Sequence, residues 1–223
     1  MTCPGVAAEP RWRDGSPHLS DPGRERFWTP ATWITIVRTL VSGLLAFAAA
    51  KQGDLTLLLV ALGVYWVGDV ADGACARHFD HETRYGAILD IVCDRFNAAM
   101  FYAGLVWLQP ELTWPVALYV AEFMTIDTFN SLAFLAWPVR SPNYFHEVDN
   151  KIWLMNWSKP AKAANSATFA ILMVWTGWVW LGFLIAGAMW LVKIWTLRRL
   201  LAIGLPLPCD DVLPSPPGDT SLA

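Results

Sequence analysis

The sequence carries little charge, and this excludes several classes of protein. Only 16% of its 223 residues are charged, against about 25% in an average soluble domain. The net charge of −3 is too small for a nucleic-acid binder or a highly charged disordered chain. The four cysteines form no Cys-x-x-Cys pair, so neither a zinc ribbon nor a disulfide framework is indicated. The first thirty residues contain no apolar core, so we expect no secretory signal peptide.

The sequence is instead rich in apolar residues. Hydrophobic residues make up 55% of the chain, and 14 residues are tryptophan, a side chain enriched at membrane–water interfaces. The mean hydropathy is +0.37. An all-α integral membrane protein is the class that this composition favours.

Long apolar runs predict six transmembrane helices, because about 20 apolar residues cross a bilayer core. The run 163–195 contains one charge, Lys193. At about 1.5 Å per residue this run is about 50 Å long, more than the about 30 Å core, so we expect it to fold back near Thr176-Gly177. A short interfacial helix is predicted over 151–157. The other four predicted spans are 31–50, 55–79, 84–108 and 112–137.

The distribution of cations predicts the orientation. With both termini cytoplasmic, twelve of the sixteen Lys and Arg residues fall on the cytoplasmic side and only Lys51 falls in a loop on the other side. The remaining three lie within spans. We therefore expect a cytoplasmic N-terminal segment over 1–26, a membrane domain over 27–200 and a disordered C-terminal tail over 201–223.

Four aspartates stand where the predicted second and third spans approach the cytoplasmic side: Asp69, Asp72, Asp90 and Asp94. Intramembrane acids are costly, so each is a functional hypothesis by default. The i, i+3 and i, i+4 spacings place each pair on one helix face, and consecutive antiparallel helices bring the pairs to similar depth. Mutual repulsion would be relieved by divalent ions that prefer oxygen ligands, such as Mg²⁺, Mn²⁺ or Ca²⁺. Acids that merely extend from helix ends to water are the alternative.

Small residues and one cation accompany these acids. Gly73 and Ala76 allow close approach to the backbone, and Arg77 offers a planar fork suited to phosphate. Gly86 opens the face of the third span one turn before Asp90. Together with the carboxylates, they indicate a two-metal site for a diphosphate substrate in a polar cavity near the cytoplasmic side.

The spacing of these residues resembles the signature of the CDP-alcohol phosphotransferase family: Asp69-x2-Asp72-Gly73-x2-Ala76-Arg77-x8-Gly86-x3-Asp90-x3-Asp94. The resemblance implies transfer of a substituted phosphate from a CDP-linked lipid, such as CDP-diacylglycerol, to a small polar alcohol, with release of CMP. It also implies a homodimer in the cell membrane, a role in phospholipid biosynthesis and dependence on two Mg²⁺ or Mn²⁺ ions.

Roles for individual residues follow from the same resemblance. It makes Asp94 the general base that deprotonates the acceptor hydroxyl, as well as a neighbour of the metals. The implied metal ligands are Asp69, Asp72, Asp90 and Asp94. The implied contacts to the cytidine diphosphate portion are Asp69, Gly73, Ala76, Arg77, Gly86, Thr35 and Thr32. Thr32 stands where the family usually has Asn, and Arg38 inside the first span needs a carboxylate or phosphate partner.

The acceptor is less well specified by the sequence. A cationic pocket for glycerol 3-phosphate or inositol phosphate could be formed by Arg95, Arg140, Lys159 and Lys162. The alternative is that these cations, and Lys151 in particular, are explained by the positive-inside rule without any role in binding. Glu122 and Asp127 in the fourth span would lie about 140° apart on an α-helix, so they do not form one ligand pair.

Two other readings remain open at this stage. An intramembrane prenyltransferase also uses aspartate-rich helices and Mg²⁺ on a diphosphate, although it has differently spaced acids. A cation transporter would carry carboxylates in its pathway, but no inverted repeat is visible. Dependence on a cytidine nucleotide separates the transferase from the transporter.

Overall fold

The computed structural model describes residues 18–204, and within them the fold is entirely helical apart from one isolated bridge between Leu19 and Val139. Of the predicted disordered tail 201–223, residues 205–223 lie outside the described residues, whereas 201–203 are the last residues of a helix that ends at Ile203. Residues 1–17 of the predicted N-terminal segment also lie outside the described residues. The longer helices are α1 (Pro30–Gln52), α2 (Leu55–His78), α3 (Arg84–Leu108), α4 (Thr113–Glu122), α7 (Lys159–Thr176) and α8 (Val179–Ile203). Two short helices are α5 (Thr128–Leu132) and α6 (Asn150–Asn156).

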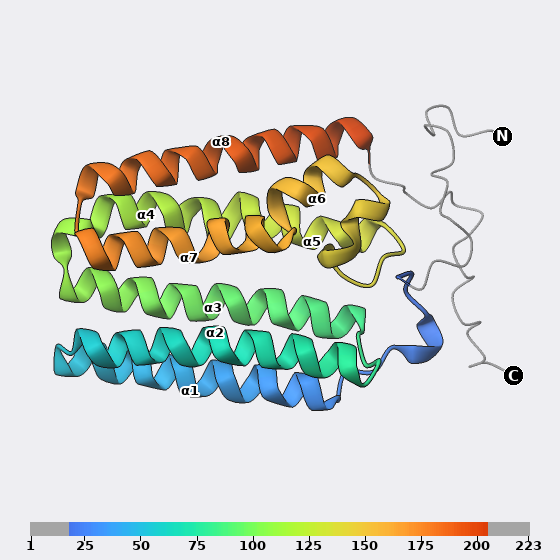
Figure 1. The fold of residues 1–223 in the computed structure, drawn as a ribbon, viewed down its shortest axis with the longest axis horizontal. Helices are drawn as coiled ribbons and strands as arrows, with labels where there is room; N and C mark the ends of the chain where they lie inside the picture. The colour runs from blue at the N-terminus through green and yellow to red at the C-terminus, as the bar shows by residue number, and fades with distance from the viewer. Residues whose placement is uncertain (1–17, 205–223) are drawn as a thin grey trace, which may run out of the picture.

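The long helices lie side by side along one direction (Figure 1). Helices α1, α2 and α3 pack against one another, and α4, α7 and α8 form a second group that meets the first through α3 and α4. The two ends of the described part of the chain lie at the same end of the bundle (Figure 1). We call this end the site end, because the aspartates described below lie towards it.

Local sequence explains where these helices begin and end. The hydroxyl of Thr29 accepts a hydrogen bond from the Thr32 amide at the start of α1, and the Asp54 carboxylate caps α2 in the same way. Gly53 (φ 69°) and Gly177 (φ 64°) end α1 and α7 in the left-handed conformation. The fold-back predicted at Thr176-Gly177 is therefore confirmed, since α7 ends and α8 begins there.

Within residues 18–204, four helices are long and apolar enough to cross a membrane: α1, α2, α3 and α8. The predicted spans 31–50, 55–79 and 84–108 match α1 to α3 closely. The region predicted as a fourth span is α4, a short π-helix η3 (Phe123–Asp127), α5 and a 3₁₀ turn (Ala133–Ala136). The predicted fifth and sixth spans are α7 and α8. Because the fourth region and α7 are not among the four long apolar helices, the six-span arrangement stays a proposal.

The π-helix changes the local geometry that was assumed for Glu122 and Asp127. The 140° separation of Glu122 and Asp127 assumes an uninterrupted α-helix, but residues 123–127 are wound more widely. In a π-helix the backbone hydrogen bonds join residues five apart instead of four, so the α-helical angle no longer applies between Glu122 and Asp127. Both side chains are buried, and single π turns of this kind are frequent at functional sites.

Candidate active site

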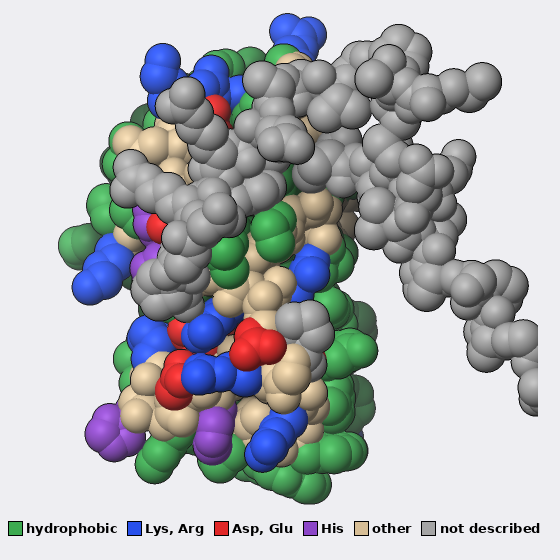
Figure 2. Space-filling model, turned by 90° about the vertical axis from the view of Figure 1, so that its right-hand side faces the viewer, with side chains coloured by type: hydrophobic (Ala, Val, Ile, Leu, Met, Phe, Trp, Pro, Cys, Tyr) green, Lys and Arg blue, Asp and Glu red, His purple; other side chains and the backbone are tan. Residues whose placement is uncertain are grey.

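A cavity of about 240 Å³ lies between the two helix groups towards the site end. Its lining includes the first turns of α1, the second half of α2 and the first half of α3. On the surface of this end, charged and histidine side chains gather between flanks of hydrophobic side chains (Figure 2). The cavity therefore lies towards an end of the bundle whose surface carries charged side chains.

The four aspartates, which line the cavity, converge on one buried guanidinium. Arg38, whose side chain is only 2% exposed, donates from Nε to Asp72 at 2.9 Å and lies with Nη2 3.3 Å from Asp69. The same Nη2 atom contacts Asp90 at 2.5 Å and Asp94 at 3.2 Å. A single buried cation thus contacts four acids from two helices. The sequence predicted only that Arg38 needs an anionic partner.

The close approach of α1 and α2 is what places Arg38 there. A Cβ atom on Gly68 of α2 would lie 2.5 Å from the Cβ of Arg38 and 2.6 Å from its Cδ, so only glycine fits at this crossing. Thr35, one turn before Arg38, donates its hydroxyl to Asp72 at 2.7 Å. Asp72 is therefore fixed by two donors from α1 and is itself buried.

Three of the aspartates meet the simplest geometric condition for a metal site. Carboxylate oxygens of Asp69, Asp72 and Asp90 lie within 4.8 Å of one another. This donor set consists of hard oxygen atoms, which suits Mg²⁺ or Mn²⁺. The Asp94 carboxylate is partly exposed beside them, at 26% of its side-chain surface, and lines the same cavity.

Every residue predicted to contact cytidine diphosphate also lines this cavity. Arg77 is exposed at the end of α2, and its guanidinium lies over Gly73, where an added Cβ would be 3.1 Å from Nη1. Thr83 caps α3 by accepting from the Gly86 amide at 3.0 Å. The Thr32 hydroxyl, at the position where Asn is usual, donates to the backbone carbonyl of Phe27 at 2.7 Å.

The predicted acceptor cations separate into two groups. Arg95 and Lys162 line the cavity, whereas Arg140 and Lys159 are not part of its lining. Arg140 instead donates to the Leu19 carbonyl at 2.9 Å and lies 3.4 Å from Asp80. The structure therefore brings only two of the four predicted cations to the site.

A buried ion network that the sequence analysis did not assign extends the cavity wall beside Asp94. Asp127 of η3 is paired with Arg95 at 2.5 Å and with Lys193 of α8 at 2.7 Å. The ammonium of Lys193 also donates to Asn156 of α6 at 2.8 Å. The guanidinium of Arg95 stacks on Phe123, 3.7 Å from its ring centre. The signal for Lys193 was its position as the only charge in a long apolar run.

Comparison with known proteins agrees with this geometry. The sequence profile described as CDP-alcohol phosphatidyltransferase matches residues 28–197. The chain belongs to this family. A CDP-alcohol phosphatidyltransferase is neither a prenyltransferase nor a transporter, so both of those alternatives are set aside for this CDP-alcohol phosphatidyltransferase family protein.

Three curated proteins that share one name are similar to this chain. The phosphatidylinositol phosphate synthase of Mycobacteroides abscessus is 32% identical over 108 residues, covering 48% of this chain and 49% of the relative. Proteins of the same name from Mycolicibacterium smegmatis and Corynebacterium glutamicum are each 34% identical, over 96 and 93 residues. They are covered over 43% and 42% of their length, with 40% of this chain aligned in each case. The alignments thus span about half or less of these relatives, and no solved structure matches.

Proposed function

We propose that this protein transfers the phosphatidyl group of a CDP-linked lipid, CDP-diacylglycerol, to the hydroxyl of an inositol phosphate and releases CMP. The observation that carries the proposal is the convergence of Asp69, Asp72, Asp90 and Asp94 in one cavity of a chain from this family. The name of the relatives favours inositol phosphate over glycerol 3-phosphate as acceptor.

The aspartate cluster fits the divalent ions that the family implies. Four carboxylates meet there against the single guanidinium of Arg38, so the cluster keeps a net negative charge that attracts cations. Asp69, Asp72, Asp90 and Asp94 would hold two Mg²⁺ or Mn²⁺ ions. Such ions supply charge that offsets the negative charge growing on the leaving phosphate.

On the donor side, the proposal assigns binding and orientation to residues of α1 and α2. Ala76 leaves the helix backbone open to the nucleotide, and Gly73 leaves room for the Arg77 guanidinium that lies over it. Arg77 offers a bidentate fork to the diphosphate. Gly86 leaves space across the cavity on α3. Thr35 and Arg38 of α1 donate hydrogen bonds to Asp72, which fixes this carboxylate before substrate arrives.

On the acceptor side, Asp94 is the proposed general base. It lies beside the metal-binding acids but is partly exposed to the cavity, so a hydroxyl can come within hydrogen-bond reach of its free oxygen. Lys162 and Arg95 line the cavity and would attract the phosphate of the acceptor. Asp127 holds the Arg95 guanidinium in place through its ion pair.

The proposed setting is the cell membrane. Six spans with both termini cytoplasmic would place the site end, and the cavity with it, at the cytoplasmic face, where soluble acceptors are available. A membrane domain over 27–200 that works as a homodimer completes the proposal.

The test is CMP release from CDP-diacylglycerol by detergent-purified protein with Mg²⁺ or Mn²⁺. Parallel reactions contain inositol phosphate, inositol, glycerol 3-phosphate or no acceptor. We expect release with inositol phosphate and loss of release in Asp94→Asn. Release that depends on glycerol 3-phosphate alone would overturn the acceptor assignment, and release by Asp94→Asn at the wild-type rate would overturn the base assignment.

A further inference from the structure

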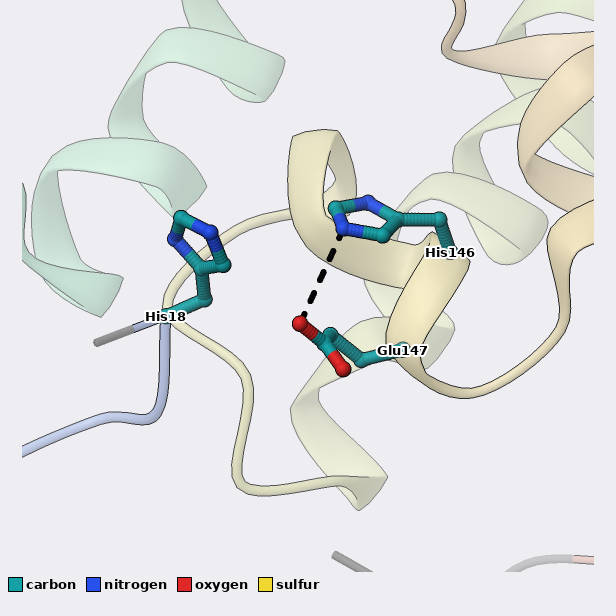
Figure 3. Close-up of side chains that lie close together, drawn as sticks. All are labelled: His18, His146 and Glu147. Atoms are coloured by element: carbon teal, nitrogen blue, oxygen red, sulfur yellow. Dashed lines mark ion pairs between the residues drawn. The ribbon is translucent and has the colours of Figure 1, made fainter. Parts of the chain in front are cut away.

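Three side chains outside the cavity offer a second donor set of a different kind. One ligand atom each from His18, His146 and Glu147 can be chosen so that all three lie within 4.8 Å of one another. Figure 3 shows them converging from two separate segments. His18 comes from the N-terminal stretch, and the other two come from the 3₁₀ helix η5 (Pro142–Glu147). None of the three belongs to the proposed substrate or metal site described above.

The backbones that carry these residues are tied to each other. Residues Leu19 and Val139 form the isolated bridge, and the Arg140 amide donates to the His18 carbonyl at 3.1 Å. Two residues after His18, the Ser20 amide donates to the Pro138 carbonyl at 2.8 Å. The N-terminal stretch is therefore held in register against the loop that leads into η5.

The imidazole rings are also held by aromatic contacts. The His18 ring stacks on Tyr144 with centroids 4.2 Å apart and planes 14° apart. The His146 ring meets Trp153 of α6 edge-on at 5.4 Å. Because packing limits the rotation of both rings, less conformational entropy remains to be lost when a ligand binds.

Two imidazoles and one carboxylate form a donor set typical of Zn²⁺ and unlike the all-oxygen sets of Mg²⁺ and Ca²⁺. Ligand atoms at about 2.0–2.1 Å from a tetrahedral zinc ion are separated by about 3.4 Å. His146 Nε2 and Glu147 Oε1 are 3.7 Å apart, which is close to that value. The other two separations among the three ligand atoms are no more than 4.8 Å.

We propose that His18, His146 and Glu147 bind one Zn²⁺ ion, with water as the fourth ligand, and that this ion fastens the N-terminal stretch to η5. Such an ion would also affect the cavity. Ser141, Pro142 and Asn143, at the start of η5, form part of the cavity wall. The zinc would lie at the other end of η5 and would fix that wall from outside. The site is independent of the proposed reaction.

The test measures zinc binding by full-length protein without a histidine tag, stripped of metal and then titrated with Zn²⁺ in excess Mg²⁺. The Mg²⁺ occupies oxygen-only sites and leaves nitrogen ligands available. The variants are His146→Asn and Glu147→Gln, and the matched control is His78→Asn, which removes an exposed histidine from the end of α2. Co²⁺ serves as a second probe, since its visible spectrum reports tetrahedral nitrogen and oxygen coordination.

We expect one tightly bound Zn²⁺ per chain in the wild type and in His78→Asn, and at least about tenfold weaker binding in His146→Asn and Glu147→Gln. The tetrahedral Co²⁺ spectrum should be lost in the same two variants. Zinc should also slow hydrogen exchange at residues 18–20 and 141–147. Absence of Zn²⁺ binding in the wild type, or equal binding in wild type and His146→Asn, overturns the proposal. Loss of binding in His78→Asn instead would assign the ion to the end of α2.

Discussion

Gly68→Ala is the substitution that tests the crossing of α1 and α2 most directly. The added Cβ would lie 2.5 Å from Arg38 Cβ and 2.6 Å from Arg38 Cδ, whereas carbon atoms in contact settle at about 3.5–4.0 Å. Relief therefore requires about 1 Å of movement between the helices. The contacts of Arg38 with Asp69 and Asp94, now 3.3 and 3.2 Å, would then be broken.

The expected cost has two parts. Overpacking a tight contact costs about 1–3 kcal/mol, which corresponds to roughly 2–12 °C in thermal midpoint for a chain of this size. A misplacement of about 1 Å in a catalytic centre costs about 100-fold in rate. We therefore expect Gly68→Ala to unfold at lower temperature in detergent and to release CMP about 100-fold more slowly.

Gly63→Ala is the matched control. It lies on the same helix, and no heavy atom outside its own helix lies within 4 Å of an added Cβ, so we expect unchanged activity and a midpoint equal to or above that of the wild type. Thermal unfolding followed by tryptophan fluorescence and CMP release measure both effects. Wild-type stability and activity in Gly68→Ala would refute the reasoning.

Three further predictions concern single side chains. Asp94→Asn should retain CDP-lipid binding, measured by equilibrium titration, while CMP release falls to background. Lys162→Ala should raise KM for inositol phosphate about 10- to 100-fold through loss of a charged contact, with kcat little changed, whereas Lys159→Ala outside the cavity lining should leave KM unchanged. Partial burial favours a raised pKa for Asp149, but hydrogen bonds from Arg199 at 2.9 and 2.7 Å lower it overall. This carboxylate therefore stabilises the fold above pH about 4, and the contribution is lost as pH falls through the lower folded pKa; Asp149→Asn should cost about 1–2 kcal/mol at neutral pH and flatten that acid dependence of thermal unfolding.

The sequence was most informative where structure is determined locally. Helices α1 to α3 begin and end close to the predicted residues, because the length of an apolar run and the capping side chains at its ends are both written in consecutive residues. The turn at Gly177 follows from a run too long for one crossing. The grouping of the four aspartates on two facing helices was predictable from spacing alone.

Features that depend on contacts between distant segments were not predictable. The π-helix at 123–127 lies where Asp127 meets Arg95 and Lys193, and no local pattern specifies that geometry. The sequence likewise showed that Arg38 needs an anionic partner but not that one guanidinium would contact all four carboxylates. The separation of Lys162 from Lys159 depends on where α7 begins relative to the cavity.

The contact of Arg38 with four acids has a consequence for the order in which ligands bind. Four ionised carboxylates and one guanidinium sum to a formal charge of about −3, which repels an anionic nucleotide. Two divalent cations would change that sum to about +1, which attracts a diphosphate. Electrostatics alone therefore favours an ordered sequence in which the ions enter first and the CDP-lipid second, and nucleotide affinity should rise steeply with the concentration of free divalent cation.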